Sequence, residues 1–248
     1  MLLYIYCFLL AILIIALIFL FKYQTWHIQN STAHLLLIGP RDAGKSRLFI
    51  KLTMPFNESI QTVTSQKHNV ALLKWDQQRK CRVVDIPGHG SVFQSEFNQW
   101  RMALMNTWYS KLCAFVLVIN HDKLHEQIRE FASHLVHVFQ EFQLAKTERK
   151  KVLVFVAQSY TPAISDSNEA ISLLNVQKQI DKEINTFLKS KEFELSETSQ
   201  KANSQYKQLS KYGKSEDYIN ICDWQIGSID DRQTIEELKE WIQTAFSF

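Results

Sequence analysis

Cysteine is scarce in this chain of 248 residues, and its four cysteines lie far apart, with no CxxC pair and no metal-ligand spacing. This pattern argues against a disulfide framework and favours free, buried thiols in a reducing compartment. The net charge of +3 is too small to indicate a nucleic-acid-binding surface, so we expect no direct nucleic-acid partner. The chain also lacks internal repeats and the HExxH arrangement of a zinc site.

Glycine is also scarce, with six residues in all, yet four of them fall in two short loops. The first loop, "GPRDAGKS", matches the phosphate-binding pattern G-x-x-x-x-G-K-[ST] at Gly39, Gly44, Lys45 and Ser46. An apolar, strand-like run precedes it and a helix-like segment follows. Glycines let consecutive N–H groups surround phosphates, Lys45 supplies a positive charge to them, and Ser46 offers a hydroxyl to Mg²⁺. The sequence therefore predicts a nucleotide-binding loop.

The second glycine-bearing loop is "DIPGHG", residues 85–90, at the end of another apolar run. Asp85 could hold Mg²⁺ through water, and the N–H of Gly88 could reach the γ phosphate, as in the D-x-x-G loop of a nucleotide switch. His89 stands where a side chain could orient the attacking water. An equally good interpretation makes His89 a solvent-facing turn residue.

A switch threonine for Mg²⁺ and the γ phosphate is expected between these two loops. The segment "SIQTVTSQKHN" offers Thr62 and Thr64. We favour Thr62 because of its distance from the next strand-like run, and Thr64 stays an alternative.

The amino terminus is an uncharged apolar run from Met1 to Phe21. About 20 such residues cross the hydrocarbon core of a membrane as a helix. No basic residue precedes the run and no small-residue cleavage site follows it, so we predict an anchor at residues 1–22 rather than a signal peptide. A linker at 23–32 follows. Lys22 lies on the carboxyl side, which places the rest of the chain in the cytosol under the positive-inside rule.

The remainder, residues 33–248, alternates apolar runs with amphipathic helical segments, which predicts an α/β fold with a mostly parallel sheet covered on both faces. "VALLKW" and "CRVVDI" are separated by a short polar segment, so we expect a hairpin at one edge. The last strand is expected at "YINIC", residues 218–222, and the last helix at residues 234–246, with a capping box from Thr234 to Glu237. The polar segment 189–217 is expected to be a flexible surface insert.

The order of these features resembles the beta subunits of the signal recognition particle receptor, and the resemblance covers nearly the whole chain. The Arf and Sar small GTPases share the expected fold but not the anchor. The resemblance implies a P-loop GTPase-like domain that binds GTP and Mg²⁺, a receptor alpha subunit as partner, and a single-pass protein of the endoplasmic reticulum membrane with its GTPase domain in the cytosol. It implies phosphate contacts from the loop residues Gly39, Arg41, Asp42, Ala43, Gly44, Lys45, Ser46 and Arg47, a γ-phosphate contact from Gly88, and Mg²⁺ ligation at Ser46, Thr62 and Asp85.

The regions expected to read the base depart from the guanine-specific N-K-x-D pattern. The strand "VLVFVA" ends in "QSYTP", where Gln158 can still bond like an asparagine but Thr161 offers no carboxylate. The later base-contacting loop corresponds to "CDWQIG", which begins at Cys222. Asp223 or Asp166 could replace the lost carboxylate in space.

Two further hypotheses remain open beside the receptor subunit. One is a degenerate GTPase that acts as a scaffold independent of nucleotide, which the altered base-reading residues favour. The other is an Arf-like trafficking GTPase. Arg41 and Asp42 are bulky residues inside the phosphate-binding loop, and we therefore predict slow hydrolysis.

Overall fold

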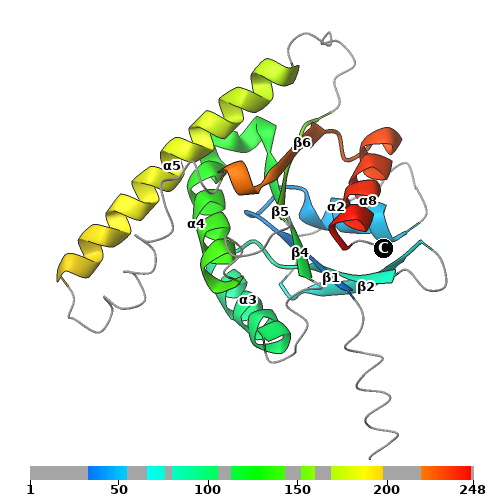
Figure 1. Cartoon of the computed structure of the whole chain (residues 1–248), viewed down its shortest axis with the longest axis horizontal. Helices are drawn as coiled ribbons and strands as arrows, with labels where there is room; N and C mark the ends of the chain where they lie inside the picture. The colour runs from blue at the N-terminus through cyan, green and yellow to red at the C-terminus, as the bar shows by residue number, and fades with distance from the viewer. Residues whose placement is uncertain are drawn as a thin grey trace, which may run out of the picture.

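The computed structural model describes residues 33–54, 66–75, 80–105, 113–142, 152–159, 169–197 and 219–246. Its centre is a six-stranded sheet with the strand order β2-β3-β1-β4-β5-β6 (Figure 1). The strands are β1 (Ala33–Ile38), β2 (Asn69–Lys74), β3 (Lys80–Asp85), β4 (Cys113–Asn120), β5 (Val152–Ala157) and β6 (Asp223–Gly227). All neighbours pair in parallel except β2, which pairs antiparallel with β3 at the edge. The predicted α/β fold and its edge hairpin are thus confirmed.

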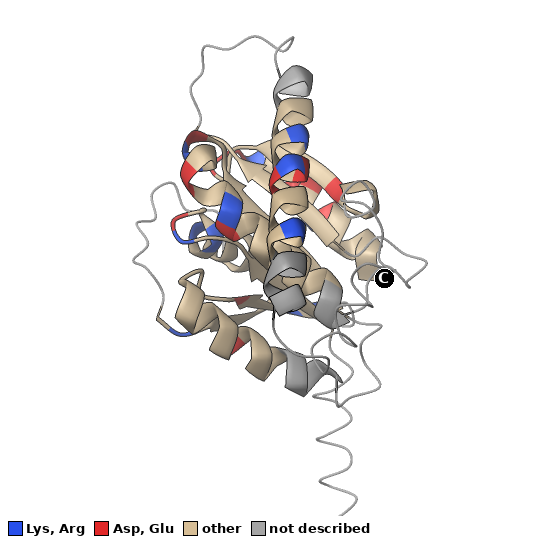
Figure 2. Cartoon of the chain, turned by 90° about the vertical axis from the view of Figure 1, so that its left-hand side faces the viewer, with Lys and Arg blue, Asp and Glu red and all other residues tan. Residues whose placement is uncertain are grey.

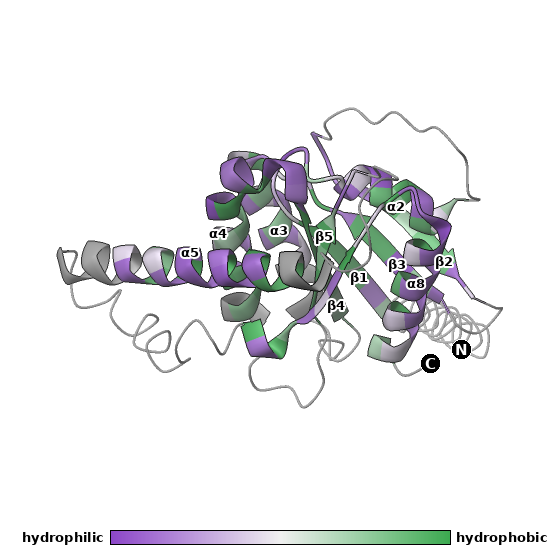
Figure 3. Ribbon diagram, turned by 90° about the horizontal axis from the view of Figure 1, so that it is seen from above, coloured by the Kyte–Doolittle hydropathy of each residue, from purple (hydrophilic) through white to green (hydrophobic). Residues whose placement is uncertain are grey.

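Helices cover both faces of this sheet (Figure 3). They are α2 (Lys45–Thr53), α3 (Gly90–Met105), α4 (Leu124–Phe142), α5 (Glu169–Glu197) and α8 (Arg232–Phe246), and the 3-10 turn η2 (His121–Lys123) precedes α4. Residues of α2 and α8 pack on one face, and residues of α3, α4 and α5 pack on the other. The result is a three-layer sandwich with two separate cores.

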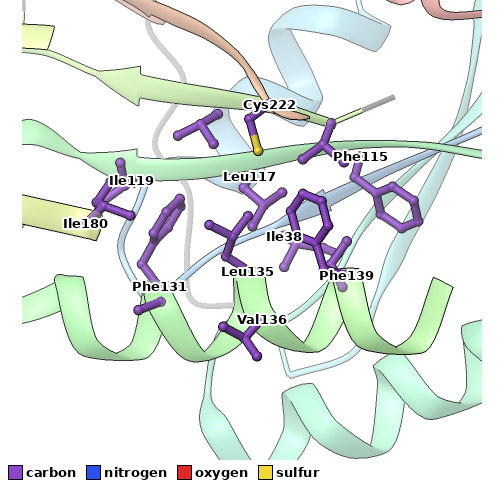
Figure 4. Packing of buried hydrophobic residues seen from close by; sticks show 14 of the residues in the cluster. Ile38, Phe115, Leu117, Ile119, Phe131, Leu135, Val136, Phe139, Ile180 and Cys222 are labelled. Carbon is purple, nitrogen blue, oxygen red and sulfur yellow. The ribbon is translucent and has the colours of Figure 1, made fainter. Parts of the chain in front are cut away.

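The central strands β1, β4 and β5 are almost entirely apolar because both of their faces are buried. In β1, Leu36 and Ile38 enter the core beneath α4, whereas Leu35 and Leu37 enter the core beneath α2 and α8. Figure 4 shows the first core, where Phe131 and Leu135 of α4 meet the central strands. Fixing β1 from both sides also fixes the position of the loop that leaves it at Ile38.

The helix α5 is longer than the sequence suggests. Val176, Ile180 and Ile184, spaced by one helical turn, are buried on its inner side, and its lysines and acidic residues are visible along its length in Figure 2. The polar segment expected from Lys189 begins with nine residues that continue α5 to Glu197. They contain lysine and glutamate, which are good helix formers. Residues 198–217 of that segment lie outside the described residues.

The last strand was predicted at 218–222, and this prediction is wrong. Residues 219–221 form a helical turn, and β6 begins at Asp223. The turn is closed by the indole of Trp224, which donates to the carbonyl oxygen of Ile219 at 3.1 Å. Ile221 is half-buried against the core and Cys222 is fully buried, so the apolar run is explained by packing rather than by a strand.

The last helix begins two residues earlier than expected, at Arg232, and its cap is Asp231 rather than Thr234. One carboxylate oxygen of Asp231 accepts hydrogen bonds from the backbone N–H and the hydroxyl of Thr234 at 2.9 and 2.7 Å. These bonds lower the pKa of Asp231. Thr234 is therefore the third residue of the helix, and its backbone N–H and hydroxyl both donate to the capping carboxylate.

The predicted anchor and linker, residues 1–32, lie outside the described residues. Within the ranges that the structure describes, no helix is both long and apolar enough to cross a membrane.

Candidate functional site

The loop of residues 39–46 joins β1 to α2 at the carboxyl edge of the sheet. Gly39 has φ +154°, and a Cβ on it would lie 2.1 Å from the carbonyl oxygen of Val118 in β4. Only glycine therefore lets the chain leave β1 so close to its neighbouring strand. Asp42 adopts the left-handed conformation with φ 59°. Arg41 and Asp42 are exposed, whereas Ala43 is buried.

Lys45 is buried at the first position of α2. Its ammonium group donates to the carbonyl oxygen of Pro40 at 2.6 Å, across the turn of the loop. Burial lowers the pKa of Lys45 to about 8, although the charges of Asp85, Glu130 and Asp42 oppose the shift. The side chain therefore remains mostly protonated at neutral pH and holds a positive charge inside the loop.

Ser46 and Asp85 meet beside this lysine. The hydroxyl of Ser46 donates to Oδ2 of Asp85 at 2.6 Å, and the amide of Asn69 donates to the same oxygen at 3.2 Å. Asp85 is fully buried, and among the described residues its other oxygen, Oδ1, has no hydrogen-bond partner. Burial raises the pKa of Asp85 against the effect of the Ser46 and Asn69 hydrogen bonds and the charge of Lys45.

A divalent cation fits this pair of side chains. Mg²⁺ in proteins is typically held by one or two protein oxygens and completes its shell with water and phosphate. A carboxylate oxygen without a hydrogen-bond partner beside a serine hydroxyl offers that donor set. Among the described residues, no group of three or more His, Cys, Asp or Glu side chains is placed so that it could hold a metal ion.

The second predicted loop lies directly on the first. A Cβ on Gly88 would lie 2.5 Å from the carbonyl carbon of Pro40 and 2.6 Å from both the carbonyl oxygen of Gly39 and Nζ of Lys45. The two glycine-bearing loops therefore contact each other in the fold. His89 is exposed beside them, and its Nδ1 lies 3.3 Å from the hydroxyl of Ser91. A role for His89 in orienting water stays a prediction.

The side chain of Arg47 points to a residue that the sequence analysis did not select. Its guanidinium lies 2.5 Å from Oδ2 of Asp230, in the loop after β6, and the buried Lys51 lies 3.7 Å from Oδ1 of the same residue. Any phosphate contact from Arg47 is thus left to its backbone N–H. The signal that could have identified Asp230 was an acidic residue after the last strand, which was hidden because that strand was misplaced.

The predicted base-reading residues separate into two groups. Gln158 and Ser159 lie at the carboxyl end of β5, with the N–H of Gln158 bonded to the carbonyl oxygen of Gly227 at 3.0 Å and the hydroxyl of Ser159 donating to Asp122 at 2.5 Å. Cys222 and Asp223 lie at the amino end of β6 instead, at the opposite edge of the sheet from the 39–46 loop.

The assignment of Cys222 to the nucleotide is therefore wrong, because Cys222 is buried in the core. The prediction that Asp223 replaces the missing base-reading carboxylate is also wrong. Asp223 accepts a hydrogen bond from the indole of Trp241 at 2.8 Å, far from the 39–46 loop. Thr62, Thr64, Thr161 and Asp166 lie outside the described residues.

These features define the class of the domain, which is a P-loop GTPase-like α/β fold. The solved structure titled "The Structure of the Mammalian SRP Receptor" matches 86% of this chain and 99% of its own, with a TM-score of 0.52 and 19% identity. Toc33 from Arabidopsis thaliana matches 91% of this chain and 88% of its own, with a TM-score of 0.54 and 12% identity. At such identities the two likenesses show the fold alone.

The family is shown by the sequence. Residues 30–221 match the family described as the signal recognition particle receptor beta subunit, and the chain belongs to that family. The signal recognition particle receptor subunit beta of Mus musculus is 23% identical over 176 residues, which cover 71% of this chain and 60% of the mouse protein. The Homo sapiens protein of the same name is 23% identical over 158 residues, which cover 64% of this chain and 53% of its own length. The match thus spans less than two thirds of either relative.

Proposed function

We propose that this chain is the membrane-anchored, GTP-binding subunit of a signal recognition particle receptor, and that it holds the alpha subunit at the endoplasmic reticulum for co-translational protein targeting. Family membership supports the receptor role. The observation that carries nucleotide binding is the buried cluster in which Ser46 bonds Asp85 beside Lys45, under the loop of Gly88.

The residues of this cluster divide the work of binding a triphosphate. The N–H groups of the 39–46 loop and the start of α2 surround the phosphates, because unpaired N–H groups and the helix dipole favour anions there. Lys45 gains charged phosphate oxygens as acceptors in place of the carbonyl of Pro40. Ser46 and Asp85 would hold Mg²⁺, which neutralises phosphate charge when bound, and Thr62 or Thr64 would join them. The N–H of Gly88 would contact the γ phosphate.

The base is held less selectively than in a GTPase with an intact N-K-x-D motif. Gln158 offers an amide for the purine ring, but Thr161 cannot accept from the guanine N1–H and amino groups as a carboxylate does. The loss of such a charge-assisted pair costs about 1.5–3 kcal/mol, or about one to two decades of affinity. GTP remains the proposed ligand, with a reduced preference over other purine nucleotides.

Hydrolysis is expected to be slow. Arg41 and Asp42 are bulky, exposed residues of the phosphate loop, and the charged atoms of their side chains lie 3.8 Å apart. They occupy the approach of an arginine finger supplied by a partner. Single-turnover hydrolysis of bound GTP by the full chain in detergent tests this, with Arg41→Gly as the comparison. Rapid hydrolysis by the unchanged protein without a partner would contradict the prediction.

The remaining parts of the proposal concern the membrane and the partner. Met1 to Phe21 would anchor the chain with its GTPase domain in the cytosol. The surface built by the two switch segments would bind the receptor alpha subunit in the GTP-bound state. The altered base-reading positions Gln158 and Ser159 favour a second candidate, a scaffold that binds the alpha subunit without regard to nucleotide.

One experiment separates these candidates. The full chain is purified in detergent from its own membranes, denatured, and the released nucleotide is identified by chromatography. GTP or GDP supports the proposal, and an adenine nucleotide overturns the base assignment. The absence of nucleotide together with captured alpha subunit supports the scaffold instead.

A further inference from the structure

A buried glutamine of α4 connects the 39–46 loop to the end of β4. Gln127 is only 5% exposed, and both ends of its amide are used. Its Nε2 donates to the carbonyl oxygen of Arg41 at 2.9 Å, and its Oε1 accepts from the backbone N–H of Asn120 at 3.1 Å. The side chain thus fixes the orientation of one peptide group in the middle of the loop.

That orientation decides where the next N–H points. A trans peptide is planar, with its C=O and N–H directed to opposite sides, and the described residues contain no cis peptide. Holding the carbonyl of Arg41 toward α4 therefore directs the N–H of Asp42 away from α4. Asp42 itself is left-handed, with φ 59°. A left-handed residue among right-handed ones makes successive N–H groups converge into an anion-binding concavity.

We propose that Gln127 is a positioning residue that aims the backbone N–H of Asp42 at the bound phosphates. The inference rests on the proposed nucleotide binding and deepens it, because it names a residue outside the glycine-bearing loops. Gln127 touches no phosphate and acts through the Arg41–Asp42 peptide. Its Nε2 group, which donates to the carbonyl of Arg41, is the part that affects ligand binding. Its Oε1 atom accepts from Asn120 and keeps α4 attached to the end of β4.

The alternative is that Gln127 only satisfies buried backbone groups and stabilises the fold. Gln127→Glu separates the two roles, since a carboxylate can still accept from Asn120 but cannot donate to the carbonyl of Arg41. When that carboxyl is protonated its O–H becomes a donor again, and burial favours the protonated form over the charged one. A positioning role therefore predicts a loss of affinity that acid reverses.

The test uses the full chain in detergent and measures the dissociation constant of GDP with Mg²⁺ from about pH 8 to about pH 6, a range in which a buried glutamate can gain its proton. Gln127→Glu is expected to bind GDP about tenfold or more weakly than wild type at the alkaline end, the equivalent of one lost hydrogen bond. The ratio to wild type should approach one at the acid end. Expressing each value as a ratio to wild type removes the pH dependence that comes from Lys45 and Asp85, which Gln127→Glu shares with wild type.

Three further variants make the outcome unambiguous. Gln179→Glu, on the exposed side of α5, is the matched control and should follow wild type at every pH. Gln127→Met cannot donate at any pH, so it should bind weakly throughout, and its thermal midpoint shows whether it remains folded. Lys45→Ala tests nucleotide binding itself.

If wild type binds GDP and Gln127→Glu keeps a constant ratio to it at all pH values, the positioning role is wrong and the proposed function stands. If wild type binds no nucleotide, or if Lys45→Ala binds as well as wild type, the proposed function fails.

Discussion

Lys45 and Asp85 lie inside the protein with opposite charges, and burial shifts the pKa of each toward its neutral form. Each charge opposes the other's shift, and Ser46 and Asn69 add hydrogen bonds to Asp85. Buried charges are tolerated only when they are paired in this way. At the residue scale the site is therefore a compact cluster of buried polar groups beside the apolar cores, and its behaviour depends on single atoms.

Gly88 is the position where one added methyl group matters most. In Gly88→Ala the new Cβ meets the backbone of Gly39 and Pro40 at under 3 Å, so the 85–90 loop must move off the phosphate loop. We expect a loss of GTP affinity of at least about tenfold, which corresponds to about 1.4 kcal/mol. Gly90→Ala is the matched control, since a Cβ there meets nothing within 4 Å. Equal GTP affinity of the two variants in equilibrium titration would refute the packing described for Gly88.

His134 gives the fold a dependence on acid. It is 3% exposed on α4, and its ring centroid lies 3.8 Å from that of Phe93 in α3. Burial lowers its pKa to about 3, and the positive charge of Lys45 and the proximity of His137 add to the effect. The unfolded chain therefore binds a proton between the unfolded pKa of about 6.5 and the folded value, while the folded protein does not.

Stability from His134 is thus complete above about pH 6.5 and is lost as the pH falls, by about 1.4 kcal/mol between about pH 7.5 and pH 5.5. Replacement by phenylalanine should flatten the pH dependence of the unfolding free energy by this amount in urea titrations of the full chain. His125→Phe, at an exposed position of the same helix, should not. An unchanged slope in His134→Phe would show that another group carries the acid sensitivity.

At the scale of elements, α2 is attached to the loop after β6 by charge as well as by packing. Asp230 bonds Arg47 at 2.5 Å and lies 3.7 Å from Lys51, whose side chain is 1% exposed. Arg47 and Lys51 both lie on α2, the helix that begins at Lys45. The carboxylate therefore holds the first turns of α2 against the end of the sheet, next to the phosphate loop.

Removal of this carboxylate weakens the charge compensation of the buried Lys51 ammonium and takes away the ion-pair partner of Arg47. Because Asp230 itself is 37% exposed, water screens part of the loss, and we expect Asp230→Ala to lower the unfolding free energy by about 1–2 kcal/mol. Glu240→Ala, at an exposed position on α8, should change it by less than about 0.5 kcal/mol. Denaturant unfolding followed by circular dichroism makes the comparison, and equal effects would show that the pair does not stabilise the fold.

Elements also show where sequence reasoning failed. Strands buried on both faces and helices with regular apolar spacing were predicted correctly, because their patterns have a physical period. The run at 218–222 was apolar too, but it packs as a helical turn, so periodicity could not separate it from a strand. Because the last strand was predicted too early in the sequence, Cys222 was assigned to the wrong edge of the sheet. For the same reason Asp230 was not recognised as part of the loop that follows this strand. Gln127 carried no signal, since nothing in a helical sequence shows which polar residue will face a loop.

At the scale of the whole molecule, the amino and carboxyl ends of the parallel strands form two opposite edges of the sheet with different proposed roles. The carboxyl ends of β1 and β3 carry the two glycine-bearing loops, and those of β5 and β6 carry Gln158 and Ser228 beside them. Ala33, where the described chain begins, is the first residue of β1 and lies at the amino edge of the sheet. Ligands of such sheets bind outside the carboxyl ends of the strands. The architecture therefore places the proposed nucleotide site on the side opposite the start of β1.

The sequence predicts the phosphate half of the proposed site, because glycine, lysine, serine and aspartate have narrow physical roles there. It does not predict the base half, because Gln158 and Ser159 fit no single purine and the neighbouring residues 160–168 lie outside the described ranges. We therefore predict strong, lysine-dependent phosphate recognition with a modest preference for guanine.

Titration calorimetry of the full chain in detergent with GTP and with ATP, in the presence of Mg²⁺, tests this most directly. The prediction is saturable binding of GTP, weaker binding of ATP, and loss of both in Lys45→Ala. Failure of the unchanged protein to bind either nucleotide, or binding that survives Lys45→Ala, would contradict the account.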